Sequence, residues 1–122
     1  PGLSVNDFGD AIRFGASTAA EDERDLSRVH FDLGLYKAYV KGYLSTCGKS
    51  LTKMETAMLP VGAKMMTLEC GMRFLADHLA GDVYFHVSRK GQNLDRARTQ
   101  FRLVEEMEQH WAQMHEIVEE TD

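Results

Sequence analysis

Apolar residues recur at helical spacing along almost the whole chain, and this periodicity restricts the fold more than any other feature of the sequence. Steps of three and four residues separate the leucines, methionines and valines, whereas alternating β-branched runs are nearly absent. The two prolines, Pro1 and Pro60, occupy positions that are compatible with this pattern. The sequence therefore predicts an all-α fold, and its length of 122 residues corresponds to one domain.

Capping signals predict where the first helices begin and end. Ser4–Asp7 is a capping-box pattern that opens a short helix ending near Gly15, and the acidic segment Thr18–Asp25 follows as a loop. Asp32 is the expected N-cap of a second helix, which a left-handed Gly48 is expected to terminate.

The longest predicted helix runs from about Leu59 to Leu79 and is expected to be the central one. Thr52 begins a second capping box before it, Pro60 fits its first turn, and Gly81 ends it. One face of this helix carries a regular apolar stripe: Val61, Met65, Leu68, Met72, Leu75 and Leu79. A shorter stripe lies on nearly the opposite side: Met66, Cys70 and Phe74. A helix with two apolar faces is expected to be packed on both.

A last helix is predicted from Asn93, its expected N-cap, to about Val118, after a short irregular link at Val83–Val87. Its apolar residues follow a heptad line with neighbours alongside: Ala97, Phe101, Val104, Met107, Trp111, Met114 and Val118. Its basic residues lie near its start and its acidic residues near its end, which opposes the helix macrodipole. Two explanations remain open: pairing of the basic start with the acidic loop Glu21–Asp25, or an anionic ligand.

Charge and cysteine content argue against several classes of function. A net charge of −5 argues against a general affinity for nucleic acid or for an anionic membrane. Cys47 and Cys70 are too few for a disulfide scaffold, which indicates a reducing compartment. The sequence also lacks a run of roughly 18 apolar residues and a secretory leader pattern, so a cytoplasmic location is expected.

Metal-binding signals are weak. Asp7-Phe8-Gly9 matches the metal-binding tripeptide of protein kinases, but it lies inside a capped helix rather than after a strand, which favours a capping role for Asp7. No two of the five histidines have the i, i+4 spacing that places two imidazoles on one helix face. We therefore expect no metal on this chain itself.

Arg73 is the most informative charged residue, because it lies on the central helix four residues from both Glu69 and Asp77. The three charges can form a ladder of surface ion pairs, worth about 0.2–0.5 kcal/mol each. Because they interleave with the shorter apolar stripe, they can instead face a cleft, where an arginine fork binds oxygen atoms of a polar ligand. The residues alone leave both interpretations open.

The sequence contains four blocks in a characteristic order: Pro1–Ala16, Leu68–Leu75, Gly81–Phe85 and Asn93–Phe101. Together they resemble the C-terminal third of the N-acetylhexosamine 1-kinases, which belong to the aminoglycoside phosphotransferase and choline kinase superfamily. The resemblance extends over essentially the whole chain. It implies a bilobal, protein-kinase-like fold in which this chain is the helical C-terminal subdomain.

The resemblance also implies a reaction, the transfer of the ATP γ-phosphate to the anomeric hydroxyl of N-acetylglucosamine or N-acetylgalactosamine. In the family, the catalytic aspartate, the metal-binding Asp-x-Asp-Thr segment and the glycine-rich nucleotide lobe all precede the Pro-Gly pair with which this chain begins. The chain is therefore expected to be a fragment of a larger kinase. It is expected to be inactive alone, because ATP and Mg²⁺ would bind to the missing N-terminal kinase portion.

Arg73 and Tyr84 match the arginine and tyrosine with which the family contacts its sugar, in the Gly-Met-Arg-Phe and Asp-Val-Tyr-Phe segments. The resemblance thus implies that both residues bind the N-acetylhexosamine, and it assigns no catalytic residue to this chain. A tyrosine supplies both a hydroxyl and an aromatic face, which sugar sites often require.

Apolar surface that the rest of a kinase normally covers would be exposed on the isolated chain. We therefore expect the isolated chain to self-associate. A function of a different class is also open: a stand-alone helical module that keeps this fold and binds a protein partner through the same surface.

Overall fold

The computed structural model describes residues 5–121, which form helices and loops without a β-strand. The elements in chain order are α1 (Val5–Gly15), η1 (Leu26–Arg28), α2 (Leu33–Cys47), η2 (Gly48–Ser50), α3 (Lys53–Ala57), α4 (Leu59–Ala80), α5 (Gln92–Gln109) and α6 (Trp111–Thr121). The two η elements are short 3₁₀ helices. The predicted all-α class is therefore confirmed for this part of the chain. None of its helices is both long enough and apolar enough to cross a membrane.

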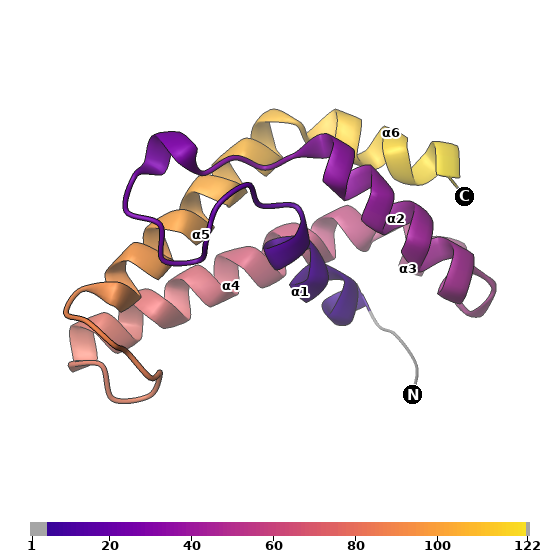
Figure 1. The fold of residues 1–122 in the computed structure, drawn as a ribbon. Helices are drawn as coiled ribbons and strands as arrows, with labels where there is room; N and C mark the ends of the chain where they lie inside the picture. Colours follow the sequence, from indigo (N-terminus) through magenta and orange to yellow (C-terminus); the bar gives the residue numbers. More distant parts are fainter. Residues whose placement is uncertain (1–4, 122) are drawn as a thin grey trace.

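The long helices α4 and α5 lie side by side and run in opposite directions, joined by the loop 81–91 (Figure 1). α1 crosses α4, and α2 packs against α1 and α6 near the opposite end of the molecule from that loop (Figure 1). Because α4 packs against both α1 and α5, its predicted central position is confirmed.

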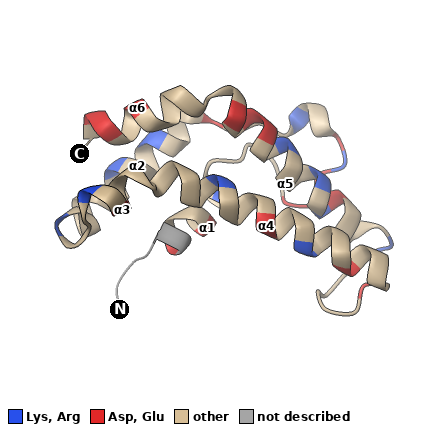
Figure 2. Ribbon diagram, turned by 180° about the vertical axis from the view of Figure 1, so that it is seen from behind, with Lys and Arg blue, Asp and Glu red and all other residues tan. Residues whose placement is uncertain are grey.

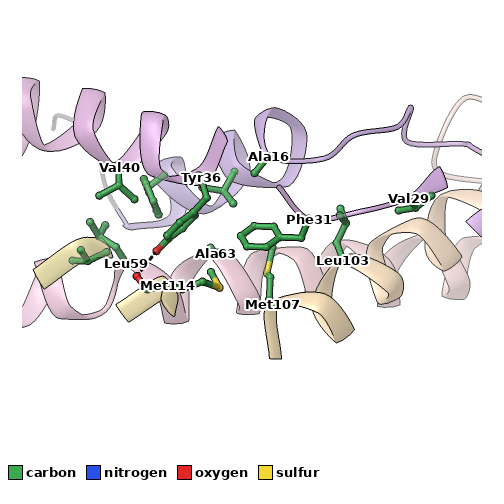
Figure 3. Packing of buried hydrophobic residues seen from close by; sticks show 13 residues of the cluster. Ala16, Val29, Phe31, Tyr36, Val40, Leu59, Ala63, Leu103, Met107 and Met114 are labelled. Carbon is green, nitrogen blue, oxygen red and sulfur yellow. Dashed lines mark hydrogen bonds between the residues drawn. The ribbon is translucent and has the colours of Figure 1, made fainter. Parts of the chain in front are cut away.

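The hydrophobic core lies between these helices and includes three residues from the segment between α1 and α2, namely Ala16, Val29 and Phe31 (Figure 3). Its buried members are Phe8, Ile12, Ala16, Val29, Phe31, Tyr36, Val40, Leu59, Ala63, Leu103, Met107, Met114 and Val118. The hydroxyl of the fully buried Tyr36 donates a hydrogen bond of 3.2 Å to the backbone oxygen of Met114, which connects α2 to α6 (Figure 3). Burial also raises the pKa of the Tyr36 hydroxyl.

Most of the predicted helix boundaries are confirmed. Asp32 caps α2 through its side chain, and Thr52 forms both hydrogen bonds of a capping box at the start of α3. Pro60 lies in the first turn of α4, and Gly81 ends that helix with a left-handed φ of 96°. The predicted capping box at Ser4 lies outside the described residues.

Three predicted boundaries are wrong. Gly48 is right-handed, with φ −57° and ψ −35°, because the chain continues from α2 directly into η2. Asn93 is not the N-cap of α5, since the helix begins at Gln92 after a left-handed Gly91. The single predicted last helix is divided at His110 into α5 and α6, and this bend directs α6 toward α2.

The long apolar stripe of α4 is only partly covered, contrary to the expectation that both faces would be packed: Val61, Leu68 and Leu75 are half-buried, and the other three residues are exposed. Met65 is 55% exposed, Met72 57% and Leu79 77%. The buried side of α4 includes small residues, such as Gly62, Ala63 and Gly71, at the places where α1 and α5 approach the helix closely. A Cβ atom on Gly71, for example, would lie 2.8 Å from the ring of Phe101. Viewed from behind, α4 lies in front of the other helices and has few charged residues (Figure 2).

The acidic loop after α1 pairs with basic residues just before and within the start of α5. A guanidinium nitrogen of Arg89 lies 3.4 Å from a carboxylate oxygen of Asp22, and one of Arg96 lies 3.8 Å from Glu21. The buried Arg13 of α1 also pairs with Glu21. Of the two explanations that the sequence left open for the basic start of α5, pairing with the loop is the one observed for Arg89 and Arg96.

Candidate functional site

Asp77, in the last turn of α4, organises the loop that follows this helix. One of its carboxylate oxygens accepts hydrogen bonds from the backbone N–H groups of Val83 (3.0 Å) and Tyr84 (2.7 Å). The other oxygen accepts from the N–H of Phe85 (3.0 Å) and from the side-chain amide of Asn93 (2.8 Å). We call these four hydrogen bonds the Asp77 clamp, and they fix residues 83–85 against α4 and α5.

Asn93 is fully buried, which explains why it does not cap α5. Besides its bond to Asp77, its amide donates to a carboxylate oxygen of Asp82 at 3.0 Å, and its oxygen accepts from Arg96 at 3.0 Å. Buried polar groups are stable only when they are hydrogen-bonded. The side chain of Asn93 meets this requirement with partners on α4, in the loop and on α5, so it is unavailable to cap the helix.

The clamp lowers the pKa of the Asp77 carboxyl. The N–H of Phe85 is the largest cause, and the N–H groups of Tyr84 and Val83 and the Asn93 amide act in the same direction, whereas desolvation opposes them. Because the folded-state pKa lies below the ordinary 3.8, the clamp contributes its full stability above that pH. The contribution is lost as the pH falls through the lowered pKa.

We therefore expect acid to release residues 83–85. Hydrogen-exchange protection factors of the Val83, Tyr84 and Phe85 amides should be constant above the ordinary carboxyl pKa of 3.8 and should decrease below it. In an Asp77→Asn variant the protection should be low at every pH, because the amide group loses part of the acceptor capacity. Protection that is equal in the two proteins across this range would contradict the clamp.

Arg73 lies about one turn before Asp77 on α4, and its guanidinium faces aromatic rings. The guanidinium carbon is 5.6 Å from the ring centroid of Tyr84 and 5.7 Å from that of Phe85. Within residues 5–121 it makes neither an ion pair nor a hydrogen bond. Arg73 thus does not form the possible ion pair with Asp77, because the Asp77 oxygens already accept hydrogen bonds from the loop amides. The two predicted site residues, Arg73 and Tyr84, are brought together.

These residues surround a hollow of about 370 Å³, lined by Arg73, Ala76, Asp77, Ala80, Tyr84 and Phe85. Tyr84 is 72% exposed and meets the Phe85 ring edge-on, with 4.9 Å between ring centroids. Phe85 in turn packs on the buried Phe74 at 4.7 Å. Aromatic faces beside a guanidinium with open donors suit a polar ligand that also has apolar C–H surfaces, such as a carbohydrate.

A second, larger hollow of about 540 Å³ adjoins the first. It follows the exposed stripe of α4 and is lined by Met65, Met66, Leu68, Glu69, Met72, Arg73 and Ala76. Arg73 and Ala76 line both hollows. The exposed apolar face of α4 therefore extends to the edge of the Arg73 and Tyr84 site.

Sequence reasoning missed what Asp77, Phe85 and Asn93 do at this site. The sequence places Asp77 beside Arg73, either in an ion-pair ladder or facing a cleft, but it does not indicate that Asp77 binds the loop, and it indicates Asn93 only as a helix cap. A signal was available, because an acid in the last turn of a helix before a left-handed glycine can accept hydrogen bonds from the following loop. Nothing in the local pattern, however, indicated that the start of α5 would meet the same carboxylate.

The remaining motifs do not identify a second site. The Asp7-Phe8-Gly9 tripeptide lies inside α1, where Phe8 belongs to the core. Among residues 5–121, no three or more histidine, cysteine, aspartate or glutamate side chains are grouped so that they could hold a metal ion. A search against models of known protein families finds no match for the chain. The hollow beside Arg73 and the four sequence blocks are therefore the two features of the described chain that point to a function.

Proposed function

We propose that this chain is the acceptor-binding helical subdomain of an ATP-dependent sugar 1-kinase that phosphorylates the anomeric hydroxyl of N-acetylhexosamines. One observation carries the proposal: Arg73 and Tyr84, the two residues that the resemblance assigns to the sugar, line the same hollow. In this proposal ATP, Mg²⁺ and the catalytic residues belong to an N-terminal kinase portion in the cytoplasm. The chain alone has no kinase activity.

Each side chain of the hollow has a distinct task in this function. The Arg73 fork donates hydrogen bonds to a hydroxyl or to the N-acetyl oxygen of the sugar. The rings of Tyr84 and Phe85 pack against C–H groups of the sugar, and the exposed Tyr84 hydroxyl hydrogen-bonds at its edge. Binding in a fixed orientation presents the anomeric hydroxyl to the ATP γ-phosphate, and such positioning is a major contribution to phosphoryl transfer.

Tyr84 provides the first test. In the complete protein, Tyr84→Phe should weaken N-acetylglucosamine binding by about twofold to tenfold, since one neutral hydrogen bond contributes roughly 0.5–1.5 kcal/mol. Tyr84→Ala should weaken it further, because the ring is lost as well. Isothermal titration calorimetry measures both, and Tyr39→Phe on α2 is the control, since Tyr39 is also partly exposed but lies outside the hollow. Unchanged affinity in Tyr84→Ala would contradict the proposal.

The exposed stripe of α4 favours a second candidate, a stand-alone helical module that binds a protein partner. Large apolar patches on a surface commonly mark such interfaces. The reading frame upstream of Pro1 distinguishes the candidates. If it continues into an Asp-x-Asp-Thr segment, the module is excluded, and a natural start codon at this point would favour it.

Self-association of the isolated chain is expected from the same stripe. The double variant Met65→Glu, Met72→Glu should abolish self-association, because the two introduced carboxylates would have to be buried in the contact. Met54→Glu is the control, since Met54 is 77% exposed but lies on α3. Sedimentation equilibrium measures the oligomeric state of the unmodified chain and of the variants. A strictly monomeric profile of the unmodified chain at high concentration would contradict this expectation.

A further inference from the structure

We infer that Asp77 and Asn93 are positioning residues for the acceptor sugar, because they fix residues 83–85 where Tyr84 and Phe85 stand beside Arg73. This inference rests on the proposed function of the hollow. It adds two residues to which the sequence resemblance assigns no role. Neither is expected to bind the sugar through its own side chain, since the carboxylate oxygens and the amide are already hydrogen-bonded.

Packing alone does not hold the loop in place. Val83 is 79% exposed and Tyr84 72%, so these two side chains contribute little buried apolar surface. Phe85 is the only one of the three that packs on a buried ring, that of Phe74. A segment with few buried contacts opens readily unless hydrogen bonds restrain it. The order of residues 83–85 therefore depends on the three backbone bonds to Asp77.

Asn93 connects the clamp to the second long helix. It donates to Asp77 from α5 and to Asp82 within the loop, so α4, α5 and the loop meet at one buried side chain. The Asp77 oxygen that accepts from Asn93 also accepts from Phe85. Loss of the Asn93 amide would thus free the carboxylate to rotate away from the Phe85 N–H.

The clamp also keeps Arg73 available. Asp77 lies four residues after Arg73 on α4, a spacing at which the two charges commonly pair. Four donors occupy the carboxylate instead, and the guanidinium lies over Tyr84 and Phe85 without an ion pair among the described residues. Without the clamp, Asp77 and Arg73 would be free to pair, which would remove donors that the sugar requires.

Two variants of the complete protein test the inference. Asp77→Asn keeps the side-chain size but cannot accept from all three amides, and Asn93→Ala leaves the Asp77 charge in place while removing one donor. Each should raise the KM for N-acetylglucosamine at least about tenfold while leaving the KM for ATP nearly unchanged, because small displacements of positioning groups have large kinetic effects. Hydrogen exchange at residues 83–85 should increase in both. Glu116→Gln, an exposed charge change on α6, should alter none of these quantities.

Arg73→Ala, measured in parallel, separates failure of this inference from failure of the proposed function. If Arg73→Ala weakens sugar use while Asp77→Asn and Asn93→Ala release the loop without raising the sugar KM, the positioning role is overturned and the proposed function stands. If none of the three affects the sugar, both are overturned. If Asp77→Asn and Asn93→Ala reduce helix content and impair sugar and ATP parameters equally, their role is merely structural and the inference is also overturned.

Discussion

Replacing Gly9 with alanine is expected to destabilise the fold by about 1–3 kcal/mol, the usual effect of an added group in a well-packed contact. A Cβ atom at Gly9 would lie 2.6 Å from the backbone oxygen of Gly62 and 3.0 Å from the Cβ of Met66, both on α4. Because the nearest atom is backbone, a side-chain rotation cannot relieve the contact. α1 would have to move away from α4 and would take the buried Phe8 and Ile12 with it.

The same substitution at Gly42 is the matched control. A Cβ atom there would meet nothing within 4 Å, and the residue lies inside α2. Alanine should therefore stabilise the protein by about 0.5–1 kcal/mol, because glycine loses more backbone entropy in a helix. Urea unfolding of both variants gives the two free energies. A Gly9→Ala protein as stable as the unmodified one would contradict the close crossing of α1 and α4.

The helices could be predicted from the sequence wherever their signals are local. The caps at Asp32 and Thr52 and the terminator Gly81 involve neighbouring backbone groups only, and all three are confirmed. The roles predicted for Gly48 and Asn93 were wrong for the opposite reason. The conformation of Gly48 depends on the 3₁₀ turn that follows it, and the position of Asn93 depends on acceptors in another helix and in the preceding loop.

The exposed stripe of α4 illustrates a limit of periodicity. Residues such as Met65 and Met72 repeat regularly, but a regular pattern identifies a face without indicating what covers it. Close approach of α1 and α5 requires small residues, so the buried face mixes Ala63 and Gly71 with larger apolar residues such as Phe74. Such a face is difficult to recognise by hydrophobicity alone.

Within the candidate site, Arg73 and Tyr84 could be named from the sequence blocks, whereas their mutual contact could not. It depends on where the loop after α4 is held, and Asp77 and Asn93 determine that position from two different helices. Phe85 belongs to one of the four sequence blocks, but only the folded loop places its ring next to the Arg73 guanidinium.

The proposed acceptor site predicts a large effect of Arg73→Ala in the complete protein. Loss of a hydrogen bond from a charged group to a bound oxygen typically costs about 1.5–3 kcal/mol, whereas loss of an exposed cation–π contact costs only about 0.5–1 kcal/mol. Since 1.36 kcal/mol corresponds to about a factor of ten, kcat/KM for N-acetylglucosamine should fall at least about tenfold. The KM for ATP should remain nearly constant, because the proposed nucleotide site lies outside this chain.

Steady-state kinetics of Arg73→Ala with both substrates is the most direct measurement, with Arg98→Ala as the control, since Arg98 is an exposed arginine on α5 outside the hollow. The proposed function predicts a selective loss for the sugar in Arg73→Ala and none in Arg98→Ala. Sugar kinetics that remain intact in Arg73→Ala, or sugar and ATP parameters that decline equally, would contradict the assignment of this hollow to the acceptor.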